Sequence, residues 1–278
     1  MASVLDRTKA TLDGFERQEV DINGIKTVVY SAGSGDPVVY LHGAGTFTGF
    51  GFARRWTATH RVIIPYHPGF GESGDDARID SIQDHVLHYL DLFDALGLDR
   101  FSLAGSSLGG WLAAEIALTQ QHRLQKLVLV SPAGLVINDP PATDLFSIAP
   151  RDLLGYLVAD PAMLAPFLPE EHDLEFLTLR YRETTSTARL LWEGPGGNFK
   201  LSQWLHRIKT RTLLIWGECD RVKPLAHSET WLRLLPNARL EVIEGIGHLP
   251  LDEKPAVADL VADFLKETAD EQRSAVRL

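Results

Sequence analysis

The sequence has a single cysteine, no long apolar run and no excess of basic residues. Cys219 cannot form an internal disulfide and cannot alone hold a structural zinc, which is typical of a reducing compartment. No stretch approaches about 18 uninterrupted apolar residues, and the N-terminus lacks the apolar core of a secretion signal. A formal net charge of −10 disfavours a nucleic-acid partner. We therefore expect a cytoplasmic protein that binds neither membranes nor nucleic acid.

Motifs for metals and cofactors are also missing. The chain holds no zinc, calcium, phosphate-loop or dinucleotide fingerprint, so we expect no metal and no cofactor, and a small molecule as the substrate. Its 278 residues, 45% hydrophobic and 23% charged, are ordinary for a globular protein. This length suits one large α/β domain with an inserted lobe.

Two kinds of hydrophobic pattern alternate along the chain. A hairpin around Asn23-Gly24 precedes short runs that are apolar throughout, which are typical of central strands in a sheet covered on both faces. Helical patterns lie between these runs, and the clearest spans 81–96. The alternation predicts a doubly wound α/β sheet. The expected strands are Pro37–Leu41, Arg61–Pro65, Phe101–Ala104, Leu124–Val130, Thr212–Trp216 and Leu240–Ile243.

From residue 132 to about 207 the strand-like runs stop and prolines concentrate. Such a length is too long for a loop, so we expect a helical cap over the carboxyl ends of the strands, where open α/β sheets bind ligands. The chain then divides into a core (1–131), a cap (132–207) and the rest of the core (208–278). Apolar side chains of the cap would form its own core and line a pocket, or alternatively form a homodimer surface.

A Gly-x-Ser-x-Gly motif directly follows the expected strand Phe101–Ala104. Gly105-Ser106-Ser107-Leu108-Gly109 leads at once into a helical pattern, which is the setting of a nucleophilic serine on a tight turn. Glycines are needed there because Cβ atoms would collide with the adjoining strand and helix. Ser107 is therefore the candidate nucleophile, unless the motif is a plain glycine-rich strand end. The backbone N–H of Leu108 would face an oxyanion.

With this motif the chain resembles the α/β-hydrolase fold superfamily, and among its members the cap-bearing serine hydrolases, over nearly its whole length. The resemblance implies a mostly parallel eight-stranded sheet and a catalytic triad in the order Ser107, Asp220, His248. It also implies that Ala44 supplies the second oxyanion N–H. The motifs that carry it are Leu41–Gly45, Pro68–Ser73, Gly105–Gly110, Trp216–Asp220 and Gly247-His248.

Local context supports the triad partners. Asp220 follows the strand Thr212–Trp216, although a turn-forming Asp is common and Glu218 is a nearby competitor. His248 lies in a glycine-rich loop that can bring its imidazole to the serine. Cys219 is expected to be a small buried loop residue. We expect most other histidines to be solvated or capping, including His60, His85, His88, His122 and His172.

Two departures from the family pattern bear on the chemistry. Relatives usually carry Asp at the position of Tyr66, so a supporting salt bridge is in question, and Tyr66 or the adjacent His67 could lie near the pocket. A serine nucleophile disfavours dehalogenases and epoxide hydrolases of this fold, because those attack with a carboxylate and form an alkyl-enzyme.

We therefore expect an enzyme that hydrolyses a small to medium hydrophobic carboxylic ester or lactone through an acyl-enzyme. One alternative is a C–C bond hydrolase of the meta-cleavage-product type, favoured by His42–Gly45 and Gly109-Gly110. Against it, Leu249 stands where such enzymes tend to carry Trp, and the cap shows no evident arginine motif for a carboxylate. The other alternative is a ligand receptor with little turnover on the same fold.

Overall fold

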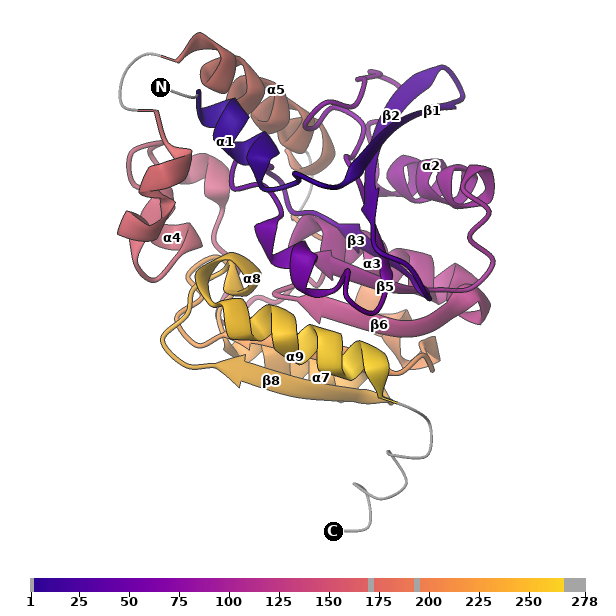
Figure 1. Ribbon diagram of the computed structural model, residues 1–278. Helices are drawn as coiled ribbons and strands as arrows, with labels where there is room; N and C mark the ends of the chain where they lie inside the picture. Colours follow the sequence, from indigo (N-terminus) through magenta and orange to yellow (C-terminus); the bar gives the residue numbers. More distant parts are fainter. Residues whose placement is uncertain (1–2, 170–172, 193–195, 268–278) are drawn as a thin grey trace.

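A computed structural model describes residues 3–169, 173–192 and 196–267 of the chain. Its eight strands form one sheet in the order β1-β2-β4-β3-β5-β6-β7-β8 (Figure 1). β1 and β2 form an antiparallel hairpin, β2 pairs antiparallel with β4, and all other neighbours are parallel. The predicted doubly wound, mostly parallel sheet is confirmed. The strands are β1 (Glu16–Ile22), β2 (Ile25–Ala32), β3 (Pro37–Leu41), β4 (Arg61–Pro65), β5 (Phe101–Ser106), β6 (Leu124–Val130), β7 (Thr212–Gly217) and β8 (Ala238–Ile243).

The hairpin turns where the sequence predicted, at Asn23 and Gly24, whose φ angles are 53° and 84°. β1 is longer than expected and begins at Glu16. The sequence did not predict this start because the first residues of β1 are exposed and carry no apolar alternation that could mark a strand. The bounds of β3, β4 and β6 match the predicted apolar runs, because most of their positions are buried on both faces of the sheet.

Helices cover both faces of the sheet. Side chains of α2 (Ile82–Ala95), α3 (Leu108–Gln120) and α7 (Ala226–Leu234) pack into the hydrophobic cluster on one face. The 3₁₀ turn η1 (Gly51–Arg55) and α9 (Pro255–Lys266) pack into the cluster on the other, where Trp56 Nε1 donates to Ala258 O at 2.9 Å. This sandwich fixes the strands whose carboxyl ends carry the site.

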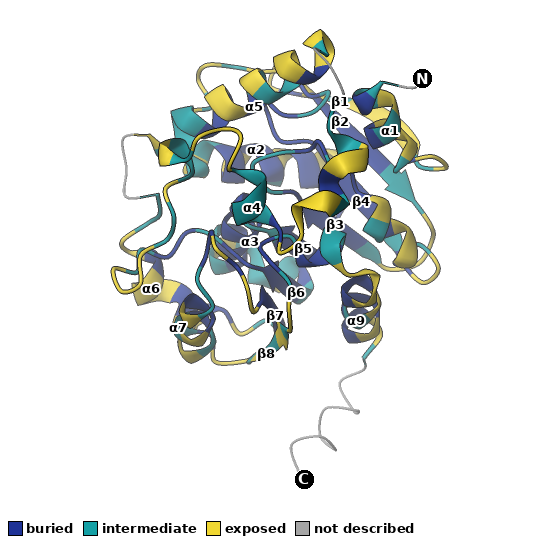
Figure 2. Ribbon diagram, turned by 90° about the vertical axis from the view of Figure 1, so that its left-hand side faces the viewer, coloured by how far each residue is buried: buried dark blue, intermediate teal, exposed yellow. Residues whose placement is uncertain are grey.

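The described part of the β6–β7 segment leaves the carboxyl end of β6, carries α4 (Leu154–Leu157) and α5 (Leu174–Leu191) over the carboxyl ends of the strands (Figures 1 and 2), and returns to the amino end of β7, where the Lys209 N–H donates to Gln121 Oε1 at 2.8 Å. Its helices are α4, α5 and α6 (Leu201–Trp204), and its described residues contain no named strand. α5 has 18 residues and is the longest of these three helices. The division of the chain at residues 131 and 207 into core and cap stays a prediction.

Two short helices border this end of the sheet. α1 (Val4–Ala10), which the sequence did not predict, begins with a capping box between Ser3 and Asp6 and packs beside α5. α8 (Pro250–Glu253) follows His248 directly. In the part of the chain that the structure describes, no helix is long and apolar enough to cross a membrane.

Several histidines expected to be solvated are buried instead. The side chains of His60, His85 and His88 are 2% to 6% exposed. The sequence did not predict this burial, because its pattern does not show where a polar side chain will find a hydrogen-bond partner in the interior. His88 Nε2, for example, lies 2.9 Å from Thr27 Oγ1 on β2. His122 is exposed as expected, and His172 lies outside the described residues. Burial lowers the pKa of His88 to about 4 and that of His42 to about 3.

These buried neutral histidines predict that acid destabilises the fold. Below the ordinary histidine pKa of 6.5 the unfolded chain takes up protons that the folded chain refuses, so stability is lost as the pH falls. For each of these histidines, the free energy of unfolding should fall by about 1 kcal/mol for every unit by which the pH is lowered. Urea unfolding between about pH 7.5 and about pH 5.5 measures this slope. His88→Gln should make it shallower, and an unchanged slope would contradict the prediction.

Candidate active site

Ser107 occupies the sharp turn between β5 and α3. Its backbone has φ 51° and ψ −112°, a region that residues with side chains adopt only under strain. The turn is held by the Ser107 N–H, which donates to Val130 O at 2.9 Å, and by Ser107 O, which accepts from the Trp111 N–H at 3.1 Å. This backbone lifts the serine hydroxyl clear of the strand.

Two glycines allow the close packing around this turn. A Cβ atom on Gly105 would overlap the carbonyl oxygen of Gly109, and a Cβ atom on Gly109 would overlap the carbonyl oxygen of Leu41 on β3. Backbone from three elements therefore meets at the turn with no room for a methyl group. The expected reason for glycine on both sides of the serine is confirmed.

The three side chains of the predicted triad lie in one hydrogen-bonded row. His248 Nε2 is 3.0 Å from Ser107 Oγ, and His248 Nδ1 is 2.8 Å from Asp220 Oδ2. A carboxylate only accepts hydrogen bonds, so Nδ1 carries the hydrogen and Nε2 is free to accept from the serine hydroxyl. The competitor Glu218 instead accepts from the Gly245 N–H, at 3.0 Å.

Asp220 is held in its ionised form. Its Oδ1 accepts from the Val222 N–H at 2.9 Å and from the Lys223 N–H at 2.8 Å. Burial alone would raise the pKa of Asp220, but the interaction with His248 and the hydrogen bond from the Lys223 N–H keep the pKa below its ordinary value. A buried carboxylate in this position can stabilise the imidazolium that forms when His248 takes a proton.

Ala44 and Leu108 both line the same cavity as Ser107. Leu108 is the first residue of α3, so its N–H has no acceptor within the helix. Ala44 lies on the loop after β3, next to Gly43, whose Cβ position would be 3.5 Å from Ser107 Cβ. Two amides beside a nucleophile, one of them at the positive end of a helix, can stabilise an oxyanion.

Two stacked histidines fix the loop that carries Ala44. His67 Nε2 donates to His42 O at 2.7 Å, the His67 backbone N–H donates to His42 Nε2 at 3.0 Å, and the ring centroids are 3.7 Å apart. His42 Nδ1 donates in turn to Gly43 O at 2.6 Å. Tyr66 and His67 are both buried, and neither lines the cavity. The hydrogen bonds of His67 therefore replace the salt bridge that an acidic residue at position 66 would make in relatives.

A cavity of about 620 Å³ opens beside Ser107 and His248. This volume is typical of a small-molecule site. In the residue ranges that the structure describes, no group of three or more His, Cys, Asp or Glu is arranged to hold a metal ion. Most of the walls are apolar, and they include Phe47, Phe50, Phe52, Trp111, Phe146, Leu153, Leu157, Leu191 and Trp192.

One cation in this cavity escaped the sequence analysis. Arg180 of α5 lines the cavity, and its guanidinium carbon lies 4.9 Å from the centroid of the Phe47 ring. The sequence shows no evident arginine motif for a carboxylate in the cap, but the structure places this arginine in the cavity wall. Arg180 stands in a run with Arg182 and Glu183, and sequence spacing alone does not show which of these charged residues faces inward.

Glu183 joins α5 to two loops of the sheet. Its buried carboxylate accepts at Oε1 from Thr46 Oγ1–H at 2.5 Å and from the Gly71 N–H at 3.2 Å. Oε2 accepts from the Thr46 N–H at 3.2 Å and lies 3.7 Å from Arg180 Nη1. Thr46 is two residues beyond Ala44, so one carboxylate fixes both the Ala44 loop and Arg180.

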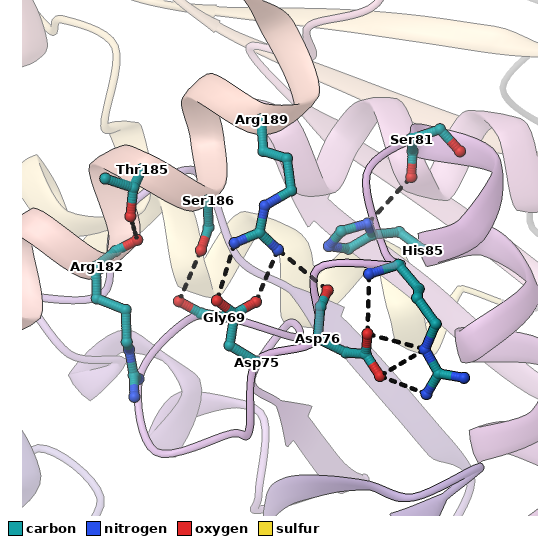
Figure 3. Close-up of polar contacts among 10 residues, drawn as sticks. Gly69, Asp75, Asp76, Ser81, His85, Arg182, Thr185, Ser186 and Arg189 are labelled. Atoms are coloured by element: carbon teal, nitrogen blue, oxygen red, sulfur yellow. Dashed lines mark hydrogen bonds and ion pairs between the residues drawn. The ribbon is translucent and has the colours of Figure 1, made fainter.

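Further polar contacts tie α5 to the loop after β4 (Figure 3). Arg189 donates to Asp75 from both terminal nitrogens, at 2.9 Å each, and to Asp76 O at 3.1 Å. Ser186 Oγ–H donates to Gly69 O at 3.2 Å. A two-pronged arginine–carboxylate pair is among the more directional contacts available to side chains. α5 is therefore held in register with the site along much of its length.

The loop of His248 is fixed by a different carboxylate. Glu253 accepts from the Gly247 N–H at 2.9 Å and from the Ala159 N–H at 2.8 Å. Nearby, the Cys219 N–H donates to Ile246 O at 2.8 Å, while its side chain is exposed. The expectation of a buried Cys219 is therefore wrong, because the loop turns the thiol outward.

The model of the alpha/beta hydrolase family matches residues 38–260. The chain belongs to the alpha/beta hydrolase family. It is 30% identical, over 276 residues, to the 2-hydroxy-6-oxo-6-phenylhexa-2,4-dienoate hydrolase of Burkholderia cepacia, with 89% of this chain and 93% of the relative covered. The expected resemblance to serine hydrolases of this fold is confirmed, and the protein is a hydrolase.

Solved structures of this family share the fold. A meta-cleavage product hydrolase from Pseudomonas fluorescens IP01 has a TM-score of 0.75 and 23% identity, covering 89% of this chain and 97% of that one. A lipase described as putative, from Acinetobacter baumannii AYE, has a TM-score of 0.77 and 21% identity, covering 95% and 96%. At these identities both similarities show only that the fold is shared.

The contacts of Glu183 predict that its replacement impairs this hydrolase. In Glu183→Gln an amide N–H₂ would face the Thr46 N–H or Arg180, so the Ala44 loop should loosen. We expect kcat for a p-nitrophenyl ester to fall by about tenfold and the melting temperature to fall with it. Ser186→Ala, on the same helix, is the matched control and should keep kcat within about twofold. Equal effects of the two variants would contradict the role of Glu183.

Proposed function

We propose that this hydrolase cleaves a carbon–carbon bond in a 2-hydroxy-6-oxo-dienoate, a vinylogous 1,5-diketone acid, by acyl transfer to Ser107. The observation that carries the proposal is Arg180, a cation in the wall of a largely apolar cavity that also contains the Ser107–His248 pair. The similarity to the Burkholderia cepacia dienoate hydrolase supports the same substrate class.

Arg180 is suited to hold the substrate's carboxylate. Glu183 remains 3.7 Å from its Nη1 and is itself occupied by Thr46 and Gly71. The planar guanidinium therefore keeps donors for a two-pronged contact with a carboxylate. Burial lowers the pKa of Arg180 from a value so high that the side chain stays charged at neutral pH.

The reaction then follows from the row of side chains. The dienol first becomes its keto tautomer, as the hydroxyl proton is lost and carbon 5 gains one. His248 removes the proton from Ser107, whose oxygen attacks the ketone carbon, and the amides of Ala44 and Leu108 stabilise the oxyanion. The bond between carbons 5 and 6 breaks, because the departing carbanion is delocalised onto the remaining ketone.

Two proton transfers complete the cycle. The imidazolium of His248 protonates the carbon fragment, which leaves as a dienol acid. His248 then takes a proton from water, whose oxygen attacks the acyl-enzyme and releases a carboxylic acid and free Ser107. In sum, the hydroxyl of water joins the acyl fragment and its hydrogen joins the carbon fragment.

Hydrolysis of an apolar ester or lactone is the second candidate. The apolar walls of the cavity and Leu249, which lines it next to His248, favour this reaction. Ser107, His248 and the two amides would serve it unchanged, because an alkoxide leaves more readily than a carbanion. The two candidates differ in what Arg180 contributes, since a neutral ester has no carboxylate to bind.

Replacement of Arg180 separates the two candidates. The wild type should bleach the coloured phenyl dienoate faster than it cleaves p-nitrophenyl butyrate. Arg180→Gln should raise KM for the dienoate by about tenfold or more and leave the ester's KM within about twofold.

Two further variants serve as controls for this assay. Arg182→Gln on the same helix should leave both values of KM nearly unchanged. Ser107→Ala should lower kcat for both substrates by about 10⁴-fold or more, with the fold intact. A wild type that cleaves the ester and leaves the dienoate intact would overturn the proposal in favour of the second candidate.

A further inference from the structure

A second cation lies in the wall of the cavity, and the reaction described above does not use it. Lys223 lies in the loop between β7 and α7, lines the cavity and is 9% exposed. Its backbone N–H donates to Asp220 Oδ1 at 2.8 Å, and its backbone carbonyl accepts from Trp216 Nε1 at 2.8 Å. Because both backbone groups are engaged inside the protein, the side chain is the part of Lys223 that can meet a ligand in the cavity.

The ammonium of Lys223 is left without a direct partner. Among the residues whose positions the structure gives, it makes no hydrogen bond and no ion pair. Asp220 is close in sequence, but its Oδ1 accepts from backbone amides and its Oδ2 faces His248 Nδ1. Asp144, which also lines the cavity, accepts from the Phe146 N–H at 2.9 Å. Neither carboxylate therefore holds the ammonium in place.

Stability does not explain a lysine at this position. Burial lowers the pKa of Lys223, and the charge of Asp220 opposes only part of that fall. A buried amine without a partner costs free energy, whereas an apolar side chain of similar size would fill the same wall without this cost. A carboxylate bound beside the amine would favour its charged form and accept from its N–H groups.

The loops that position Lys223 and Arg180 leave the sheet on opposite sides of Ser107. Arg180 packs against the loop after β3, since its Nη1 lies 2.9 Å from the position that a Cβ on Gly45 would take. Lys223 lies on the loop after β7. In the sheet β5, which leads into Ser107, lies between β3 and β7 (Figure 2). Three strand spacings, about 14 Å in all, separate β3 from β7.

This order of loops orients the substrate of the proposed function. Its carboxylate is carbon 1, Ser107 attacks carbon 6, and the acyl substituent continues from carbon 6 away from the carboxylate. With the carboxylate at Arg180 and carbon 6 at Ser107, the substituent therefore extends toward the loop after β7. Lys223 lies on that side of the cavity.

We propose that Lys223 forms an anion-binding subsite for the acyl substituent, so that the enzyme prefers dienoates with a second carboxylate beyond carbon 6 over those with an apolar group there. This inference rests on the proposed function, because the carboxylate at Arg180 sets the direction of the chain. Cleavage of such a substrate releases a dicarboxylic acid from the acyl-enzyme. The ammonium gives the second carboxylate a charge-assisted hydrogen bond, which is stronger in a water-poor wall than in solvent.

Binding to a variant without turnover tests the subsite. Titration calorimetry on Ser107→Ala compares 2-hydroxy-6-oxonona-2,4-dienedioate with 2-hydroxy-6-oxonona-2,4-dienoate, which has the same number of carbons and ends in a methyl group. The diacid should bind about tenfold or more tightly. Adding Lys223→Met, a neutral side chain of similar length, should abolish that difference by weakening the diacid alone, whereas Lys223→Arg, which keeps the charge, should preserve most of it.

Arg180→Gln on the same background is the matched control, because it should weaken both acids alike. Three results would overturn the subsite. These are equal binding of the two acids to Ser107→Ala, a preference for the diacid that survives Lys223→Met, and equal weakening of both acids by Lys223→Met, which would mean that Lys223 only shapes the wall. If Lys223→Met fails to fold, Lys223→Gln gives the same comparison.

Failure of the proposed function has a different signature. A wild type that binds the diacid selectively and cleaves neither acid would overturn the proposed reaction and support the subsite. A wild type that cleaves both acids, with a KM for each that Lys223→Met leaves unchanged, would overturn the subsite and support the reaction.

Discussion

The strained backbone at Ser107 is the constraint on which the rest of the site depends. A serine at φ 51° can be held only if neighbouring elements leave it no alternative, and glycines at positions 105 and 109 let β3, β5 and α3 close around it. The same turn places Leu108 at the start of a helix and brings Gly43 against the serine. The Ser107 hydroxyl, the two amides and the cavity thus lie together where backbone segments cross at the carboxyl edge of the sheet.

Three acidic side chains connect the remaining parts to this turn, and two of them, Asp220 and Glu183, are buried. Asp220 orients His248, Glu253 holds the loop on which His248 lies, and Glu183 joins α5 to the loop of Ala44. Each of the three accepts backbone N–H groups, which keeps its negative charge satisfied inside the protein. Arg180 differs from them because it lines the cavity with hydrogen-bonding capacity to spare, and therefore bears on which substrate fits.

The sheet and the row formed by Ser107, His248 and Asp220 could be predicted from the sequence because both leave local signals in it. Continuous apolar runs marked the buried strands, and glycine spacing marked Ser107 and the loop of His248. Sequence reasoning did not reach Arg180, whose role depends on which side of α5 faces the cavity. It also misjudged His88, since burial of a polar side chain depends on a partner distant in the sequence, such as Thr27. The thiol of Cys219 was expected to be buried and is exposed. The helix α1 was missed because seven residues carry too little periodicity.

The central claim is that Ser107, activated by His248, is the nucleophile. Labelling with a fluorophosphonate probe followed by peptide mass spectrometry tests it most directly, since the probe reacts with serines whose hydroxyl is activated. The account predicts about one adduct per chain, located on Ser107 and lost in His248→Ala. An adduct on a different serine, or no adduct on the folded wild-type protein, would contradict it.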